Sequence, residues 1–242
     1  RNLKGQYQTE IDGATATATP KAIDPVFGNN SWEVINLAST TNTIPSTWHV
    51  GDIKDITLTT GETITMQRYG FNHEDLTSGG KAGITFGMKN LMSDVKKMNS
   101  TFTNVGGFAG SDMYTWLQGN LYNTLPNDLK LYIKSVNKKT SAGNKSSTIN
   151  TNMMKIFLFS EIEVFGDIQF SATGEGNQYS IFTSQYGEKM KNLSNGTGIL
   201  KYWWLRSPRL LENSTFCATT NLGAKGYGYA NDDMGICFGF CI

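Results

Sequence analysis

Two strongly apolar segments close the chain and frame a stretch that has no apolar periodicity. The first covers residues 203–208 (WWLRSP) and the second covers residues 235–242 (GICFGFCI). Short apolar runs that end at proline or glycine are typical of buried strands. Residues 209–234 between them mix charged, apolar and glycine-rich positions. This pattern predicts a rigid framework that holds a chemically varied segment at the surface, where side chains do not have to pack a core.

Upstream, short periodic segments predict several strands. Residues 50–69 alternate apolar and polar positions on either side of the turn at 60–62, which predicts a hairpin. Further strands are expected at 84–88, 154–159 and 215–219. Together with short helices, these segments predict an α+β fold that is rich in loops, with short helices around small antiparallel sheets.

Helix signals are fewer and shorter. Leu91, Val95 and Met98 would share one face of a helix over 90–98, and residues 128–136 follow a proline at a helix start. Ser111 is a candidate N-cap for a helix over 112–119. Ser160 and Glu163 have the spacing of a capping box. Residues 140–152 are polar and are expected to form a loop.

Two regions differ in composition. Residues 1–30 contain a run of small residues with no apolar side chains to bury, which predicts a linker or a docking arm, with a disordered end as the alternative. Residues 31–242 show no internal repeat and are expected to form one domain. The variable segment lies at 209–234 within it.

Charge and hydropathy exclude two classes of partner. The net charge is +1 and the basic residues between 130 and 139 are separated by apolar ones, so the clustered Lys and Arg that neutralise phosphates are missing. Nucleic acid binding is therefore not expected. No apolar run reaches the roughly 18 residues of a membrane span, so membrane insertion is not expected either.

Few residues favour catalysis. His49 and His73 are the only histidines, and residues 71–75 (FNHED) are interpreted as a polar turn rather than an acid–base or metal site. The neighbouring carboxylates Asp232 and Asp233 are interpreted as a solvated loop rather than a calcium site. Glu161 and Glu163 are close in sequence, which does not show the facing geometry of a glycosidase. No metal and no cofactor is predicted.

Three cysteines lie in the last 26 residues, Cys217, Cys237 and Cys241. Their odd number disfavours a framework built only of disulfides, although one pair remains open. We interpret them as small buried hydrophobes. A redox role would require a basic neighbour and access to solvent, and these thiols sit among Phe, Gly and Ile.

The chain resembles the C-type-lectin-fold variable proteins of diversity-generating retroelements in phages and gut Firmicutes. The resemblance extends over roughly residues 32–242. It is carried by the two C-terminal segments and by residues 70–73, 83–92, 98–101, 115–119, 136–144, 160–166 and 193–196. It implies a C-type-lectin-like fold with a diversified C-terminal surface. The Glu-Pro-Asn and Gln-Pro-Asp triplets of calcium-dependent sugar lectins are absent.

The resemblance implies a set of exchangeable surface positions that contact a ligand. Tyr227 and Tyr229 are the foremost contact candidates, since tyrosine offers a large amphipathic area at low entropic cost. Arg206 is expected to be a structural hydrogen-bond donor beside the tryptophans. The expected ligand-binding positions are Arg209, Leu211, Glu212, Asn213, Ala218, Thr220, Leu222, Lys225, Tyr227, Tyr229, Asp232 and Met234.

The function implied is non-catalytic recognition or adhesion, as in phage receptor binding or bacterial surface display. The partner would be a protein or glycan ligand on a cell surface, and the location a phage tail or a bacterial surface. A homotrimer, or attachment to a larger fibre through the N-terminal arm, would add avidity. The alternatives are a formylglycine-generating-type enzyme on the same fold and a structural virion module without a ligand.

Overall fold

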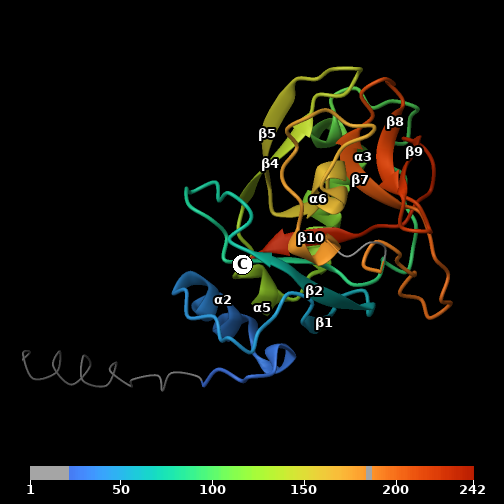
Figure 1. The fold of residues 1–242 in the computed structure, drawn as a ribbon. Helices are drawn as coiled ribbons and strands as arrows, with labels where there is room; N and C mark the ends of the chain where they lie inside the picture. Colours follow the sequence, from blue (N-terminus) through green and yellow to red (C-terminus); the bar gives the residue numbers. More distant parts are fainter. Residues whose placement is uncertain (1–21, 184–186) are drawn as a thin grey trace, which may run out of the picture.

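The computed structural model describes residues 22–183 and 187–242, and its centre is a five-stranded antiparallel sheet (Figure 1). The strand order is β1-β2-β3-β10-β6. The chain's last strand therefore lies inside the sheet, between β3 and β6. The strands are β1 (Ile53–Thr57), β2 (Thr63–Phe71), β3 (Ile84–Met88), β6 (Ile156–Leu158) and β10 (Phe238–Cys241).

Two smaller antiparallel sheets complete the strands. One is the hairpin of β4 (Val136–Ser141) and β5 (Ile149–Met154). The other has the order β7-β8-β9 and lies far from α2 in Figure 1. It consists of β7 (Trp203–Pro208), β8 (Thr215–Thr219) and β9 (Lys225–Tyr229).

The helices are short, which confirms the mixed class with small antiparallel sheets and few short helices. The longest is α2, and a π-helical stretch joins α3 to α4. The helices are α2 (Trp32–Thr40), α3 (Asp112–Trp116), α4 (Tyr122–Thr124), α5 (Asn127–Lys130) and α6 (Glu161–Phe165), the π-helix is Leu117–Leu121, and 3₁₀ turns cover Phe27–Asn29, Phe108–Gly110 and Ser180–Phe182. None of these described helices has the length and hydropathy of a membrane span.

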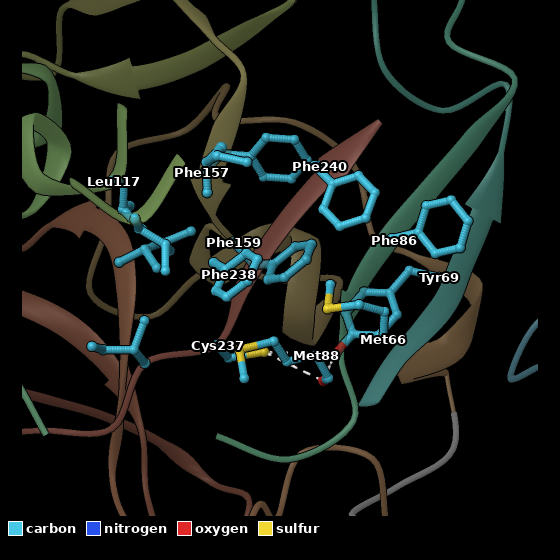
Figure 2. Close-up of a cluster of buried hydrophobic side chains, with 14 of the residues drawn as sticks. Met66, Tyr69, Phe86, Met88, Leu117, Phe157, Phe159, Cys237, Phe238 and Phe240 are labelled. Carbon is cyan, nitrogen blue, oxygen red and sulfur yellow. Dashed lines mark hydrogen bonds between the residues drawn. The ribbon is translucent and has the colours of Figure 1, made fainter. Parts of the chain in front are cut away.

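Aromatic and sulfur side chains fill the core between the central sheet and the helices (Figure 2). Phe86 and Phe240 stack at 5.1 Å on neighbouring strands, and Tyr69 lies 4.9 Å from Phe159. The Tyr69 hydroxyl is satisfied by donating to the Met88 carbonyl at 2.7 Å. Burying rings of this size contributes much of the hydrophobic free energy of folding.

Several local predictions are confirmed. The hairpin turns at residues 60–62, and strands form within 84–88, 154–159, 203–208, 215–219 and 236–242. Ser111 accepts from the Tyr114 amide as an N-cap. Ser160 and Glu163 form a complete capping box, and Gly166 ends α6 in the left-handed region at φ 79°.

Three local predictions are wrong in whole or in part because long-range pairing outweighs local pattern. Residues 90–98 are not a helix, since the Leu91 and Lys96 amides bond to the carbonyls of Asn192 and Met234. The loop predicted at 140–152 is confirmed only for residues 142–148, because 140–141 and 149–152 pair in the β4–β5 hairpin. The helix after Pro126 stops at Lys130, and residue 136 begins β4.

The N-terminal boundary also needs correction. Residues 1–21 of the predicted arm lie outside the described residues. Residues 22–30 do not extend away from the domain, because Phe27 is buried and packs edge-on against Trp48 at 5.0 Å. The Trp48 indole also donates to the Asp24 carbonyl at 3.1 Å. The packed domain therefore begins before residue 31.

Candidate functional site

β9 presents two tyrosines to solvent near the end of the chain. Tyr227 and Tyr229 are 43 % and 51 % exposed. They alternate with Gly226 and Gly228, and the backbone of Gly228 lies so close to Met234 that an added Cβ would be 2.0 Å from its side chain. The glycines thus let β9 pack tightly on one side while the tyrosines project outward.

Other ring systems and one cation gather around these tyrosines. The Tyr229 ring lies 4.6 Å from Phe102, and the Tyr227 ring lies 5.0 Å from Phe170. The Arg209 guanidinium lies 3.9 Å from the centre of the Tyr227 ring, within cation–π range. We call these five residues, Phe102, Phe170, Arg209, Tyr227 and Tyr229, the aromatic patch.

Buried groups hold the segments that carry the patch. Asn104 donates from Nδ2 to the carbonyls of Glu212 and Thr215 at 2.9 and 2.8 Å, which pins the turn after Arg209. The buried Glu161 carboxylate accepts the amides of Phe170 and Ser171, the latter at 2.8 Å. The patch is therefore preorganised, so that a ligand would not have to order it on binding.

Most predicted contact positions reach the surface. Leu211 and Leu222 are 71 % and 68 % exposed. The positions that are exposed or partly exposed are Arg209, Leu211, Glu212, Asn213, Thr220, Leu222, Lys225, Tyr227, Tyr229 and Asp232.

Ala218 and Met234 are buried, so the prediction that they present side chains to a ligand is wrong. Ala218 lies on β8, whose five residues are all buried beneath neighbouring segments. Met234 covers the bare backbone of Gly228. The resemblance implies both positions, but the sequence does not show that neighbouring segments cover the predicted strand 215–219 or that Met234 packs on Gly228.

Two of the polar positions also have structural partners. Asp232 accepts the Tyr229 amide at 2.8 Å and closes the turn after β9. Lys225 pairs with Asp167 at 2.6 Å. No group of three potential metal-ligating side chains occurs within residues 22–183 and 187–242.

Phe102 and Phe170 were missed by sequence reasoning. Each is a single aromatic residue within a polar stretch, which is weak evidence for exposure. Both residues lie in loops that are more than 50 residues from β9 in sequence. Only the tertiary structure brings them to the tyrosines.

Behind this surface lies a buried network of charged side chains. Arg206 is fully buried and donates to the Glu163 carboxylate at 2.8 Å and to the carbonyls of Leu158 and Glu175 at 3.0 and 2.6 Å. Its predicted role as a structural donor is confirmed. Lys138 bridges Glu163 at 2.6 Å and Glu74 at 2.7 Å.

The network fixes the ionisation of its carboxyl groups. Burial alone would raise the pKa of Glu163, but the charges of Arg206 and Lys138 outweigh it and hold this pKa below its ordinary value. Burial raises the pKa of Glu175 to about 7, against the opposing effects of Arg206 and a hydrogen bond from Ser207. Glu175 is thus the carboxyl group of this network whose protonated form is stabilised by burial.

The histidine-containing segment 71–75 contributes to this network. His73 stacks on Tyr179 at 3.8 Å, and its Nδ1 lies 2.9 Å from the Glu74 carboxylate. Glu74 also accepts from the Tyr179 hydroxyl. The adjoining hollow is only about 70 Å³, so the cluster has room for little more than water. This geometry favours a structural role.

The three cysteines are free and buried. Burial raises the pKa of each thiol, with the charge of Glu161 as a further cause for Cys217. The thiol of Cys237 contacts the Met88 carbonyl at 3.6 Å (Figure 2). Because the thiolate is the nucleophile, these environments oppose thiol chemistry. The interpretation as buried hydrophobes is confirmed.

Comparison with known proteins identifies a family. Residues 82–242 match the family described as "Domain of unknown function (DUF6273)". The match covers more than half of the chain, so the chain belongs to this family. No curated protein and no solved structure matches the chain.

Proposed function

We propose that this member of the family is a non-catalytic recognition protein that binds a ligand through the aromatic patch and the exposed positions around it. The observation that carries the proposal is the gathering of Phe102, Phe170 and Arg209 around the two exposed tyrosines of β9. Tyrosine and arginine are enriched among residues that dominate binding energy. Rigid aromatic contacts also lose little conformational entropy on binding.

A C-type-lectin-like fold is part of this proposal. Two features support it. The C-terminal strand β10 is inserted between β3 and β6, and residues 203–208 begin a separate small sheet that carries the outward surface. The resemblance of the C-terminal segments to variable proteins of diversity-generating retroelements rests on the same residues.

We infer that the exposed positions tolerate exchange. Leu211, Leu222 and Tyr227 have large exposed fractions. The framework beneath them is held by buried strands and by Asn104. Exposed substitutions away from special features change stability little. Diversification at these positions would therefore alter binding while preserving the fold.

The ligand class that fits is a protein or glycan on a cell surface, with the protein on a phage tail or a bacterial surface. A preorganised patch of four rings and one arginine suits such a surface. Trimerisation, or attachment to a fibre through the residues that precede the packed domain, would add avidity to weak single contacts.

Sequencing the same locus in closely related genomes tests this function. Differences should concentrate at the exposed positions between 209 and 232, while Ala218 and Met234 stay unchanged because they are buried. Uniform drift across 209–234, or frequent change at the two buried positions, would favour a structural virion module instead.

A thiol assay tests the enzymatic alternative. A formylglycine-generating-type enzyme requires a reactive thiol, and here the three thiols are buried with raised pKa values. Ellman's reagent should label the native protein slowly and the denatured protein fast. Rapid labelling of Cys237 or Cys241 in the folded protein would favour the enzyme.

A further inference from the structure

A second candidate site is a groove between the β1–β2 turn, the loop that follows β3, and the helical segment 112–124. Its main hollow has a volume of about 610 Å³. Ligand pockets in proteins commonly span about 300–1,000 Å³. A second hollow of about 330 Å³ shares Val95, Lys96 and Trp116 with the first. The two hollows therefore adjoin one another at these residues, and we refer to them together as the groove.

The groove has an apolar floor and polar walls. The floor residues Leu58, Met92, Leu121 and Ile236 are buried and belong to the core. Apart from Val95 and Trp116, the partly or fully exposed residues that line the main hollow have polar side chains. They are Thr60, Glu62, Ser93, Asp94, Lys96, Asn120 and Thr124.

Trp116 is the aromatic element of this groove. The chain has five tryptophans, all within the described residues, and the other four are at most 4 % exposed. Trp116 alone is partly exposed. The Lys96 ammonium lies 4.8 Å from the Trp116 ring centre and has no hydrogen-bond or ion-pair partner among the described residues. A ring and a donor are thus both available beside the hollow.

The backbone beside Trp116 is unusual. Residues 117–121 are π-helical, and the Tyr122 amide donates to the Leu117 carbonyl five residues earlier. π-helical turns are rare and are frequently found at functional sites. This turn carries Asn120 and Leu121, both of which line the groove. The distortion therefore lies at the wall of the hollow.

Glu62 is held in place at the opposite wall. Its Oε1 accepts the Ser93 amide and the Ser194 hydroxyl, each at 2.7 Å. Its Oε2 has no partner within the described chain. The Asp94 carboxylate is exposed and also has no hydrogen-bond or ion-pair partner within the described chain. Fixed carboxylate oxygens and the Asn120 amide could accept and donate hydrogen bonds across the groove.

We propose that this groove binds a neutral oligosaccharide chain, with one sugar ring against Trp116. Sugar rings combine an apolar C–H face, which packs on an indole, with hydroxyl groups that bond to carboxylates, amides and ammonium groups. Two adjoining hollows of about 610 and 330 Å³ provide room for more than one ring. This groove shares no lining residue with the aromatic patch.

Charge and surface chemistry disfavour other occupants. Acidic side chains along the two hollows outnumber basic ones, so a polyanion would be repelled. They are Glu62, Asp94, Asp112 and Asp233 against Lys96 and Lys97. A peptide would require exposed apolar pockets for its side chains, whereas the apolar floor of the main hollow is already packed into the core.

Acrylamide quenching of tryptophan fluorescence tests the proposal, because Trp116 is the accessible tryptophan. The whole chain is titrated separately with cellotetraose, chitotetraose, maltotetraose and mannotetraose, up to about 10 mM, which covers weak millimolar binding. At least one sugar should protect Trp116 from quenching in a saturable manner. If none of the four protects it, the proposal is wrong.

Variants assign the binding to the groove. Asn120→Ala and Asp94→Ala change exposed side chains and should leave the thermal unfolding midpoint nearly unchanged. Each should weaken sugar binding about three- to tenfold, the effect of losing one hydrogen bond. Trp116→Phe should remove the fluorescence that acrylamide quenches, so the sugar affinity of this variant would be measured by calorimetry.

Tyr227→Ala is the matched control in the aromatic patch and should leave sugar affinity unchanged. Loss of sugar binding in Tyr227→Ala, with the groove variants unaffected, would assign the sugar to the patch and overturn the groove site. Equal protection of Trp116 by unstructured tetrapeptides such as tetra-alanine would also overturn it. The proposed function of the patch is tested separately by the locus comparison.

Discussion

Arg206 and Arg209 lie three residues apart and have opposite surroundings. Arg206 is fully buried and its guanidinium bonds to a carboxylate and several carbonyls. Arg209 is partly exposed and lies over the Tyr227 ring. The first belongs to the charge network inside the domain, and the second belongs to the aromatic patch outside it.

These two clusters reverse the usual placement of residue types. The network around Arg206 holds charged groups inside the domain, and the patch around Arg209 holds aromatic rings at its surface. The buried charges hold segments together, because a buried charge without partners is costly. The exposed rings have few structural contacts. Within residues 203–234, some positions therefore stabilise the fold while neighbouring positions form the binding surface. Substitutions in the buried network should lower stability more than substitutions in the aromatic patch.

The largest effect is expected for Glu163→Ala. It would leave Arg206 and Lys138 buried without their shared carboxylate. Breaking a buried ion pair from one side costs about 3–5 kcal/mol. Urea unfolding would measure the loss. A loss below about 1 kcal/mol would contradict the structural role of the network, and Asp94→Ala, at an exposed carboxylate, is the control.

A pH effect is expected from Glu175. Its pKa is about 7 in the folded protein against 4.5 as the ordinary value, so between these pH values the unfolded chain ionises while the folded chain stays protonated. Folding stability attributable to this group therefore falls as pH rises from about 4.5 to 7, by about 3 kcal/mol.

Glu175→Gln isolates this effect, since the amide imitates the protonated carboxyl group. The variant should be more stable than the parent protein near pH 8 and similar to it near pH 4.5. Thermal or urea unfolding at both pH values would check this. A difference between the two proteins that does not change with pH would contradict the assignment.

A smaller effect is expected for Ala218→Leu, one of the two buried positions in the variable segment. Ala218 is fully buried on β8, and overpacking a core costs about 1–3 kcal/mol. Leu222→Ala, at a position that is 68 % exposed, is the control and should be nearly neutral. Equal unfolding midpoints for the two variants would contradict the placement of Ala218.

The smallest effect on stability is expected for Tyr227→Ala. The substitution removes a ring that contacts Arg209 and Phe170 at a half-exposed site. The expected loss is about 1 kcal/mol or less, as for most surface substitutions. Calorimetric melting would measure it. A loss as large as that for Glu163→Ala would mean that the patch is part of the structural core.

Local patterns predicted much of the fold. Alternation at residues 50–69, the capping box at Ser160 and the apolar segment 203–208 all produced the expected elements. These signals depend on residues that are close in sequence. The helix predicted at residues 90–98 is wrong for the converse reason. The apolar residues there are spaced as in a helix, but the backbone of this segment bonds to residues that are distant in sequence.

The candidate sites were predicted less completely. Tyr227 and Tyr229 were identified from their type and spacing, but Phe102, Phe170 and the groove around Trp116 were not. The sequence also could not show that Ala218 is covered. Exposure depends on which segments pack over a strand.

The sequence by itself determined the class of the fold, the apolar segments that form its core strands, and the scarcity of clustered charge, because each follows from residue type and short-range spacing. The tertiary structure alone decided which charges are buried together, which rings meet at the surface and where a groove remains. Those features arise from contacts between residues tens to more than a hundred positions apart, and no local pattern encodes such distances.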